Sequence, residues 1–454
     1  MPEAQQDPLQ IKASPTKEFF IYMLVRDVPL HRAIIDLVDN SIDGARRVRP
    51  NGSFDGLWVR LEVSRSHFRI ADNCGGIPVE NARNYAFRFG RPKQATSIVG
   101  SIGQFGVGMK RTFFKLGRQF RVISATSISR FSVEINLDEW IARYNPEGEE
   151  DWHFQFKTLE ESVEVPEDEQ GTTIEIDSLH ETVEESFAQD EFITRLSQDI
   201  AVAHEMSLDK GLAITLNTVP LRHNPLLLLN TELIQPAHID LEYTSLGPKP
   251  VKVKLYAGLS DRSKEEGGWY VFCNGRMVLR ADQSNLTVWD EGDRVPKYHP
   301  NFARFRGLAY FDSDDASLLP WTTTKTGVDS DSTVYRAVRQ QMIEITRPVL
   351  EFLRKVEDER RKHEDGDIRD KPLADAIAAA EASPAAVSVL PARPVFVAPQ
   401  PPPPPRGPRM QRIQYFKPAD EVERAKVLLG VTSFKEVGER TFEYYMTYEG
   451  GSDA

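Results

Sequence analysis

The chain has 454 residues, 40% of them hydrophobic, which predicts two or three domains with apolar cores. Its first ten residues are polar, apolar runs such as residues 226–229 are far too short to span a bilayer, and its two cysteines lie far apart, so we expect a cytoplasmic protein with no membrane anchor, disulfide framework or cysteine zinc site. A formal net charge of −12 argues against a surface coated for nucleic acid.

Helices come first along the chain. Ser14-Pro15 is typical of a helix start and predicts a helix through Met23, followed by a second helix over residues 31–47. Strand patterns follow at residues 57–63, 68–71, 120–124, 131–137 and 173–176. This order predicts an α+β fold with helices on one face of a mixed sheet.

A second strand-rich unit is predicted to begin near Leu212, after one charged helix over about residues 185–208. It has strand patterns at residues 251–256, 268–273 and 308–311 and closes on a long helix from Tyr335 to about Lys362. We therefore predict one domain over residues 1–210 and a second over residues 211–366.

The composition then changes. Residues 371–408 are rich in alanine and proline, which predicts a disordered linker over residues 367–410 that does not pack. An amphipathic stretch over residues 422–429 and a capping box beginning at Ser433 predict a small helical module over residues 411–454. This module would dock on the body or recruit a partner.

Three polar residues share one face of the second helix. Asp36, Asn40 and Asp43 recur at spacings of four and three, while Ile34 and its apolar neighbours turn toward a core. The Asp36 carboxylate could act as a general base, and the Asn40 amide oxygen could bind a Mg²⁺ that bridges phosphates. A solvated polar face is the alternative interpretation.

An acid stands at the end of a predicted strand. Asp72 follows residues 68–71 and precedes a turn that contains Gly75 and Gly76. Such a carboxylate can accept a hydrogen bond from an exocyclic amine such as that of adenine, and the Thr172 hydroxyl could support this contact through water. A simple Asx turn is the alternative.

Glycines cluster between residues 100 and 110. Gly103, Gly106 and Gly108 allow backbone N–H groups to approach an anion, at the start of a helix that contains Lys110. No GK[ST] follows, so this is not a P-loop. Residues 81–130 contain no acid and ten arginines and lysines, which favours neutralisation of a triphosphate, with a DNA- or RNA-contacting face as the alternative.

Together these segments resemble the GHKL superfamily of ATPases, which includes gyrase B, MutL, the MORC proteins, heat-shock chaperones and histidine kinases. Residues 36–43 are similar to the first motif of gyrase B and MutL, and residues 102–108 are similar to the glycine motif of the heat-shock class. The resemblance implies a Bergerat-type α/β sandwich that binds ATP and Mg²⁺. It assigns Mg²⁺ to Asn40 and the adenine amine to Asp72 and Gly76, assisted by Thr172. The phosphates would lie under a lid (about residues 86–100) on Gly103, Gln104, Phe105, Gly106, Val107 and Gly108.

The second unit extends the resemblance, which covers about residues 15–360. Residues 269–276 are similar to the core strand of the transducer domain of MutL and gyrase B, which implies a ribosomal-S5-like α/β domain. Residues 321–327 resemble the loop that carries a lysine to the γ-phosphate, so Lys325 is the candidate phosphate sensor and Lys110 its rival. Two departures stand out: Asp36 replaces the usual catalytic Glu, and Cys74 replaces the first glycine of the DxGxG motif.

The resemblance implies a Mg²⁺-dependent ATPase in which Asp36 and Lys325 are catalytic and ATP closes a homodimeric clamp. A different class is an ATP-binding switch with little turnover that recruits a protein partner through its C-terminal module. A DNA-associated clamp of the MORC or MutL kind is a third interpretation, and a chaperone ranks last because it would need further domains.

Overall fold

The computed structural model describes residues 13–50, 52–90, 102–103, 108–222, 225–245, 247–400 and 413–449. The chain divides into two compact units, residues 1–401 and 402–454, and the larger unit contains two main sheets. Across the described ranges, no helix combines the length and the apolar character that a membrane span requires.

The first sheet has eight strands in the order β5-β4-β3-β6-β2-β1-β7-β8. All neighbouring strands are antiparallel except the parallel pair β1 and β7, so the sheet is mixed, as predicted. The strands are β1 (Trp58–Ser64), β2 (His67–Asp72), β3 (Gly117–Thr126), β4 (Ser129–Asn136), β5 (Phe156–Glu161), β6 (Gly171–Leu179), β7 (Ala213–Leu216) and β8 (Val219–Pro220).

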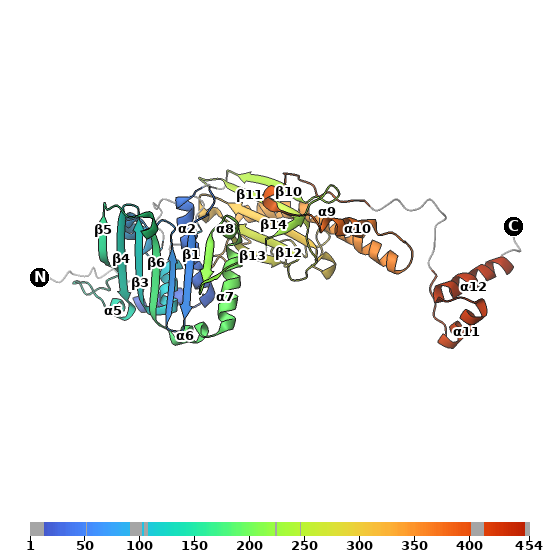
Figure 1. The fold of residues 1–454 in the computed structure, drawn as a ribbon, viewed down its shortest axis with the longest axis horizontal. Helices are drawn as coiled ribbons and strands as arrows, with labels where there is room; N and C mark the ends of the chain where they lie inside the picture. The colour runs from blue at the N-terminus through green and yellow to red at the C-terminus, as the bar shows by residue number, and fades with distance from the viewer. Residues whose placement is uncertain are drawn as a thin grey trace. The chain divides into compact units, whose positions relative to one another are not determined.

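Helices cover one face of this sheet, which gives the predicted two-layer arrangement (Figure 1). Along β1, Val59 and Leu61 are buried, whereas Arg60 and Glu62 are exposed, because successive side chains of a strand point to opposite faces. The helices are α1 (Lys17–Val25), α2 (Leu30–Val48), α3 (Val79–Asn81), α4 (Gly108–Leu116), α5 (Leu137–Ile141), α6 (Glu181–Phe187), α7 (Asp190–Ala203) and α8 (Glu205–Asp209). A π-helix at Ala82–Ala86 follows α3. Helix α2 contacts both α4 and α7, and its apolar side chains lie in the core.

The second sheet has five strands in the order β10-β11-β14-β12-β13. These are β10 (Ala237–Tyr243), β11 (Val251–Leu259), β12 (Gly268–Cys273), β13 (Arg276–Asp282) and β14 (Phe305–Asp312). Helix α9 (Thr333–Glu364) contacts β11 and β14, and an apolar cluster that includes Leu228, Tyr310 and Leu390 covers further sheet residues. With this cover, all six residues of β12 are buried.

Two predicted boundaries in the middle of the chain are wrong. Strand β7 pairs with β1, so the first sheet continues past residue 210. The single charged helix predicted over residues 185–208 is three helices, α6, α7 and α8. Charge composition indicates helix here, but it does not mark the turns at residues 188–189 and at His204.

The prediction that residues 367–410 do not pack is also wrong for the part that the structure describes. Helix α10 (Pro372–Ala380) buries Leu373 and Ile377, and strand β15 (Pro384–Ala386) pairs with β9 (Leu227–Leu229). Isolated bridges then join Arg393 to His238 and Val397 to Gln235, beside β10. We call residues 372–400 the strap.

Its order depends on contacts far away in the sequence. The Glu359 carboxylate of α9 accepts hydrogen bonds from the backbone N–H groups of Leu373 (3.0 Å) and Ala374 (2.9 Å) at the start of α10. An alanine- and proline-rich composition cannot reveal such a cap.

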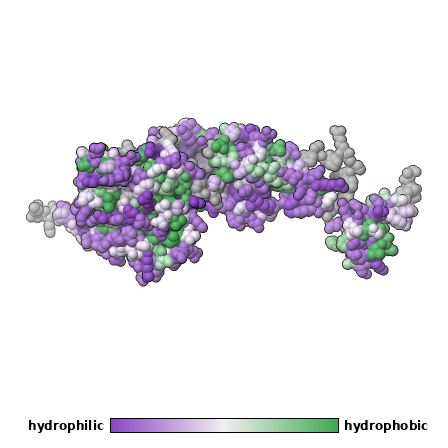
Figure 2. All heavy atoms as spheres, viewed as in Figure 1, coloured by the Kyte–Doolittle hydropathy of each residue, from purple (hydrophilic) through white to green (hydrophobic). Residues whose placement is uncertain are grey.

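The C-terminal unit contains α11 (Ala419–Leu429) and α12 (Phe434–Tyr448). The predicted capping box is present: Ser433 accepts a hydrogen bond from the Glu436 N–H, and Glu436 accepts one from the Ser433 N–H. Val427, Leu428 and Phe434 are exposed, and Figure 2 shows apolar side chains on this unit.

Candidate functional site

A pocket lies between α2 and the ends of β2 and β6. It is a small cleft that opens to solvent. Its lining residues are Leu37, Asn40, Ser41, Gly44, Arg47, Ile70, Asp72, Cys74, Gly76, Ile77, Met109, Thr172 and Ile174. Four predicted site residues, Asn40, Asp72, Gly76 and Thr172, therefore lie together.

Asp72 is the buried acid of this pocket. Its Oδ2 accepts a hydrogen bond from the Ser41 hydroxyl (2.6 Å), and its Oδ1 accepts from the N–H groups of Cys74 (2.9 Å) and Thr172 (3.3 Å). Burial raises the pKa of Asp72, and these three donors oppose that shift by stabilising the carboxylate. The carboxylate is thus held in one orientation at the pocket wall.

Thr172 contacts Asp72 through its backbone N–H, and the water-mediated contact of its hydroxyl stays a prediction. The hydroxyl pairs with the Ser124 Oγ (3.1 Å). The hydroxyl that contacts Asp72 belongs to Ser41, one turn of α2 after Leu37.

Two glycines make the turn after Asp72. Gly75 and Gly76 have φ of +80° and +65°, and a Cβ on Gly76 would lie 2.0 Å from the Ala125 carbonyl oxygen. Cys74 needs no left-handed backbone, which explains how the chain tolerates a cysteine there. Arg47 closes this side of the pocket by donating a hydrogen bond to the Gly76 carbonyl.

Asp43 binds the start of the glycine segment. Its carboxylate accepts hydrogen bonds from the N–H groups of Ile102 (2.7 Å) and Gly103 (2.8 Å). Burial raises the pKa of Asp43, opposed by Arg46 and by these two N–H groups. The Gly103 N–H is thus engaged by Asp43 in this structure, and its contact with phosphate stays a prediction.

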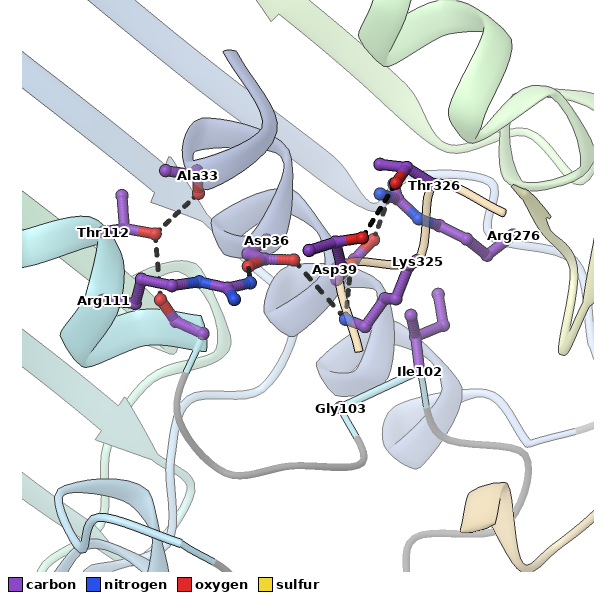
Figure 3. Close-up of polar contacts among 12 residues, drawn as sticks. Ala33, Asp36, Asp39, Ile102, Gly103, Arg111, Thr112, Arg276, Lys325 and Thr326 are labelled. Carbon is purple, nitrogen blue, oxygen red and sulfur yellow. Dashed lines mark hydrogen bonds and ion pairs between the residues drawn. The ribbon is translucent and has the colours of Figure 1, made fainter. Parts of the chain in front are cut away.

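Asp36 faces two cations. Arg111 on α4 donates a hydrogen bond to its Oδ2, and the Lys325 Nζ lies 3.6 Å from its Oδ1. Figure 3 shows the two cations approaching α2 from opposite sides. Lys325 comes from the loop at residues 321–328 in the second half of the unit, so this loop reaches the candidate base, as the resemblance implied.

Asp39, one turn after Asp36, is fully buried and has three basic neighbours. The Lys325 Nζ donates a hydrogen bond to its Oδ2 (2.7 Å), and the Arg276 Nη1 lies 3.0 Å from its Oδ1 in an ion pair without hydrogen-bond alignment. The His204 Nε2 lies 3.4 Å from the same Oδ1. Burial, then the positive charges of Arg276, Lys325 and Arg46, holds the pKa of His204 well below its usual range.

Lys110 does not reach this group. Its Nζ donates a hydrogen bond to the Ala86 carbonyl oxygen (2.8 Å), beside the π-helix. Burial lowers the pKa of Lys110 to about 7. The prediction of Lys110 as a rival phosphate sensor is therefore not supported by its position, whereas Lys325 is beside Asp36.

Asn40 is exposed in the pocket lining, which leaves its amide oxygen accessible. Among the described residues, no group of three or more His, Cys, Asp or Glu side chains could hold a metal ion. One accessible amide oxygen without an acidic cage fits a Mg²⁺ that takes its other ligands from phosphates and water.

Among the described residues, at least five of the ten cations at residues 81–130 form ion pairs with acids from other segments of the chain. Arg83 pairs with Glu161, Arg121 with Glu134, and Arg130 with Glu160, and these pairs lie partly exposed on strands or beside them. In the sequence this segment contains cations without acids, because their acidic partners lie on β4, β5 and other segments. A nucleic-acid face therefore stays a prediction.

Several predicted residues lie outside the described ranges, namely Gln104, Phe105, Gly106 and Val107, with most of the predicted lid. Gly108 is described and opens α4, where a Cβ would lie 3.3 Å from Asp36. Four residues of the site were not predicted from the sequence, namely Ser41, Asp39, Arg111 and Arg276. Only Ser41 and Asp39 had a local signal, because they lie inside the motif at residues 36–43.

Comparison of the sequence with family models gives one match, over residues 28–172, to "Histidine kinase-, DNA gyrase B-, and HSP90-like ATPase". Comparison with curated proteins gives no match. The matched segment begins before α2 and ends at Thr172, so it contains Asp36, Asn40, Asp72 and the glycine segment. Residues 28–172 are thus a domain of the histidine kinase-, DNA gyrase B- and HSP90-like ATPase family, the GHKL superfamily.

Proposed function

We propose that this protein binds Mg²⁺-ATP in the pocket beside α2 and hydrolyses it. The observation that carries the proposal is Asp72, a buried carboxylate fixed by Ser41, Cys74 and Thr172 in the pocket wall. A carboxylate fixed in this way is suited to the exocyclic amine of adenine, because three protein donors leave about one of its four acceptor positions for a ligand.

The phosphates would extend from this pocket toward Asn40 and Asp36. Asn40 would bind Mg²⁺, which would neutralise phosphate charge. Lys325 would contact the terminal phosphate, since its Nζ already lies 3.6 Å from the Asp36 Oδ1. The transition-state charge would then be met by Mg²⁺, Lys325 and backbone N–H groups.

Asp36 would orient and deprotonate the attacking water. Arg111 holds its Oδ2, which leaves Oδ1 as the oxygen that faces Lys325 and the expected position of the terminal phosphate. A carboxylate held at one oxygen has a defined direction for its other oxygen. The Arg111 pair therefore has a direct role in positioning the base.

The same pair favours a second candidate function, an ATP-binding switch with little turnover. Asp36 is one methylene shorter than the glutamate of the relatives named above, and a cation engages one of its oxygens. In this alternative the C-terminal unit, with exposed Val427, Leu428 and Phe434, recruits a protein partner. The homodimeric clamp is a proposal that the family resemblance alone supports.

Phosphate release and ATP binding separate the two functions. We expect Asp72→Asn to weaken ATP binding about tenfold to a hundredfold, because it removes a fixed acceptor. We expect Asp36→Ala to keep ATP binding and to lower turnover by about a hundredfold or more. Asp138→Ala, a change at an exposed acid paired with Arg118, is the control for losing a carboxylate.

Unchanged turnover in Asp36→Ala would remove Asp36 as the base. Tight ATP binding by the unaltered protein with negligible phosphate release would select the switch. ATP hydrolysis that increases when duplex DNA is added would support the DNA-associated clamp, although ion pairs already engage several arginines of the sheet.

A further inference from the structure

Asp39 has no part in the pocket, yet it is the most enclosed carboxylate beside the site. It is fully buried on α2, beside His204, and is contacted by two cations from other segments: Lys325 from the loop at residues 321–328 and Arg276 from β13. Figure 3 shows Asp39 between these two side chains. The contacts join α2 to the second sheet at a position next to the candidate base.

The charges around Asp39 are not balanced. Two carboxylates, Asp36 and Asp39, face three cations, Arg111, Lys325 and Arg276. Burial, and then the neighbouring cations, hold the pKa of His204 well below its usual range. The Nε and Nη2 of Arg276 have no hydrogen-bond partner among the described residues, although the side chain is fully buried. A buried group with excess positive charge favours an added anion.

Lys325 is held in an unusual backbone conformation. Its φ is +54°, in the left-handed region that residues other than glycine rarely adopt. The bridge between Trp321 and Val328 closes the loop, and the bond to Asp39 fixes the side chain. Such a conformation persists where surrounding contacts determine it, and it is concentrated at ligand clamps and switches.

We propose that Asp39 is the resting counter-ion of Lys325, and that the terminal phosphate of ATP replaces it. This inference rests on the proposed function. A phosphate beside Asp36 would be within reach of the Lys325 Nζ, which lies between the two carboxylates. Asp39 would keep Arg276 as its partner, so the exchange would leave no unpaired buried charge.

The exchange makes Asp39 a competitor of the terminal phosphate. Part of the attraction between Lys325 and ATP would be offset by breaking the contact with Asp39, whereas ADP would not require this exchange. Removing the charge of Asp39 should therefore strengthen the binding of a triphosphate relative to a diphosphate. If Asp39 had only a structural role, removing its charge would weaken the binding of both nucleotides to the same extent.

The test is calorimetric binding of ADP and of a non-hydrolysable ATP analogue, each with Mg²⁺. In Asp39→Asn we expect the preference for the analogue over ADP to rise by about fivefold or more. In Lys325→Met we expect this preference to be lost, and the double variant should behave like Lys325→Met. Asp199→Asn, which changes an acid of α7 that faces His31 on α2, is the control.

A second variant controls for a folding defect in Asp39→Asn. Such a defect is expected because this change leaves Arg276 buried opposite a neutral group. Asp39→Asn combined with Arg276→Met removes both charges and should show the same rise. An unchanged or reduced preference in the folded variants would overturn the inference while nucleotide binding by the unaltered protein stands. If the unaltered protein bound neither nucleotide, the proposed function would fail as well.

Discussion

Lys110 is a buried cation whose Nζ donates a hydrogen bond to the backbone carbonyl oxygen of Ala86. Its pKa is lowered to about 7 in the folded protein, while the unfolded chain keeps the ordinary value of 10.5. Between these values the unfolded state binds more protons, so this residue makes the protein more stable as the pH rises from 7 toward 10.

We therefore expect Lys110→Met to remove part of the pH dependence of stability. Between pH 7 and pH 9 the contribution of Lys110 to the free energy of unfolding should increase by roughly 1–2 kcal/mol, which the variant should lack. Urea unfolding at both pH values measures it, with Lys115→Met on the same helix as the control. Equal pH dependence in Lys110→Met and the unaltered protein would contradict the burial argument.

Gly76 combines a left-handed backbone with a close contact, and Gly56 allows the two effects to be separated. Both have positive φ, but a Cβ on Gly56 meets nothing within 4 Å, whereas one on Gly76 would collide with the Ala125 carbonyl. Gly56→Ala should cost about 1 kcal/mol of stability, and Gly76→Ala on the order of 3 kcal/mol with weaker ATP binding. Thermal unfolding with and without ATP measures both. Equal losses of stability in the two variants would show that the left-handed backbone alone, and not the contact with Ala125, sets the cost.

Among single residues, the sequence could predict the site residues that stand in a short local motif. Asp36, Asn40 and Asp72 stand in short motifs, and the structure places them around one pocket or next to it. Arg111 and Arg276 are ordinary residues in the sequence. Their partners lie on other segments, and only the folded chain brings them together.

Among the elements, α10 depends on a side chain from another helix. Glu359→Ala removes the carboxylate that caps it, so we expect a loss of about 1–3 kcal/mol and faster amide hydrogen exchange over residues 372–386. Glu357→Ala is the control, since Glu357 lies on the same helix and pairs with Arg360. Exchange rates that do not differ between the two variants would show that the strap is held by its apolar contacts alone.

Element prediction succeeded where periodicity is strong and failed where order comes from distant contacts. Helix α2 and the long helix α9 differ from their predicted bounds by one or two residues at each end. The strap was missed because its order depends on Glu359 and on the edge of a sheet, which local composition does not encode. The break between α6 and α7 was missed because the residues at it, Ala188 and Gln189, are good helix formers and give no stop signal.

At the scale of the molecule, the two compact units can be tested separately. A chain that ends after Pro401 should keep the unfolding midpoint of the larger unit, because the contacts of residues 1–401 are largely internal. A chain that ends after Asp370 should unfold at a lower temperature, since it loses Leu373, Ile377 and other buried side chains of the strap. Scanning calorimetry of the two truncations measures this difference. Equal midpoints would show that the strap contributes nothing to stability.

The strap also lies at a sheet edge where copies of the protein could otherwise pair with each other. Strand β10 ends the second sheet, and an open strand edge invites pairing with another chain. Arg393 and Val397 occupy hydrogen-bonding positions beside that edge. Pro391, Pro394 and Pro399 lie around them and have no backbone N–H to donate, so the strap is poorly suited to serve as the next strand. The proline-rich composition that suggests disorder is thus suited to a guard against intermolecular β-pairing.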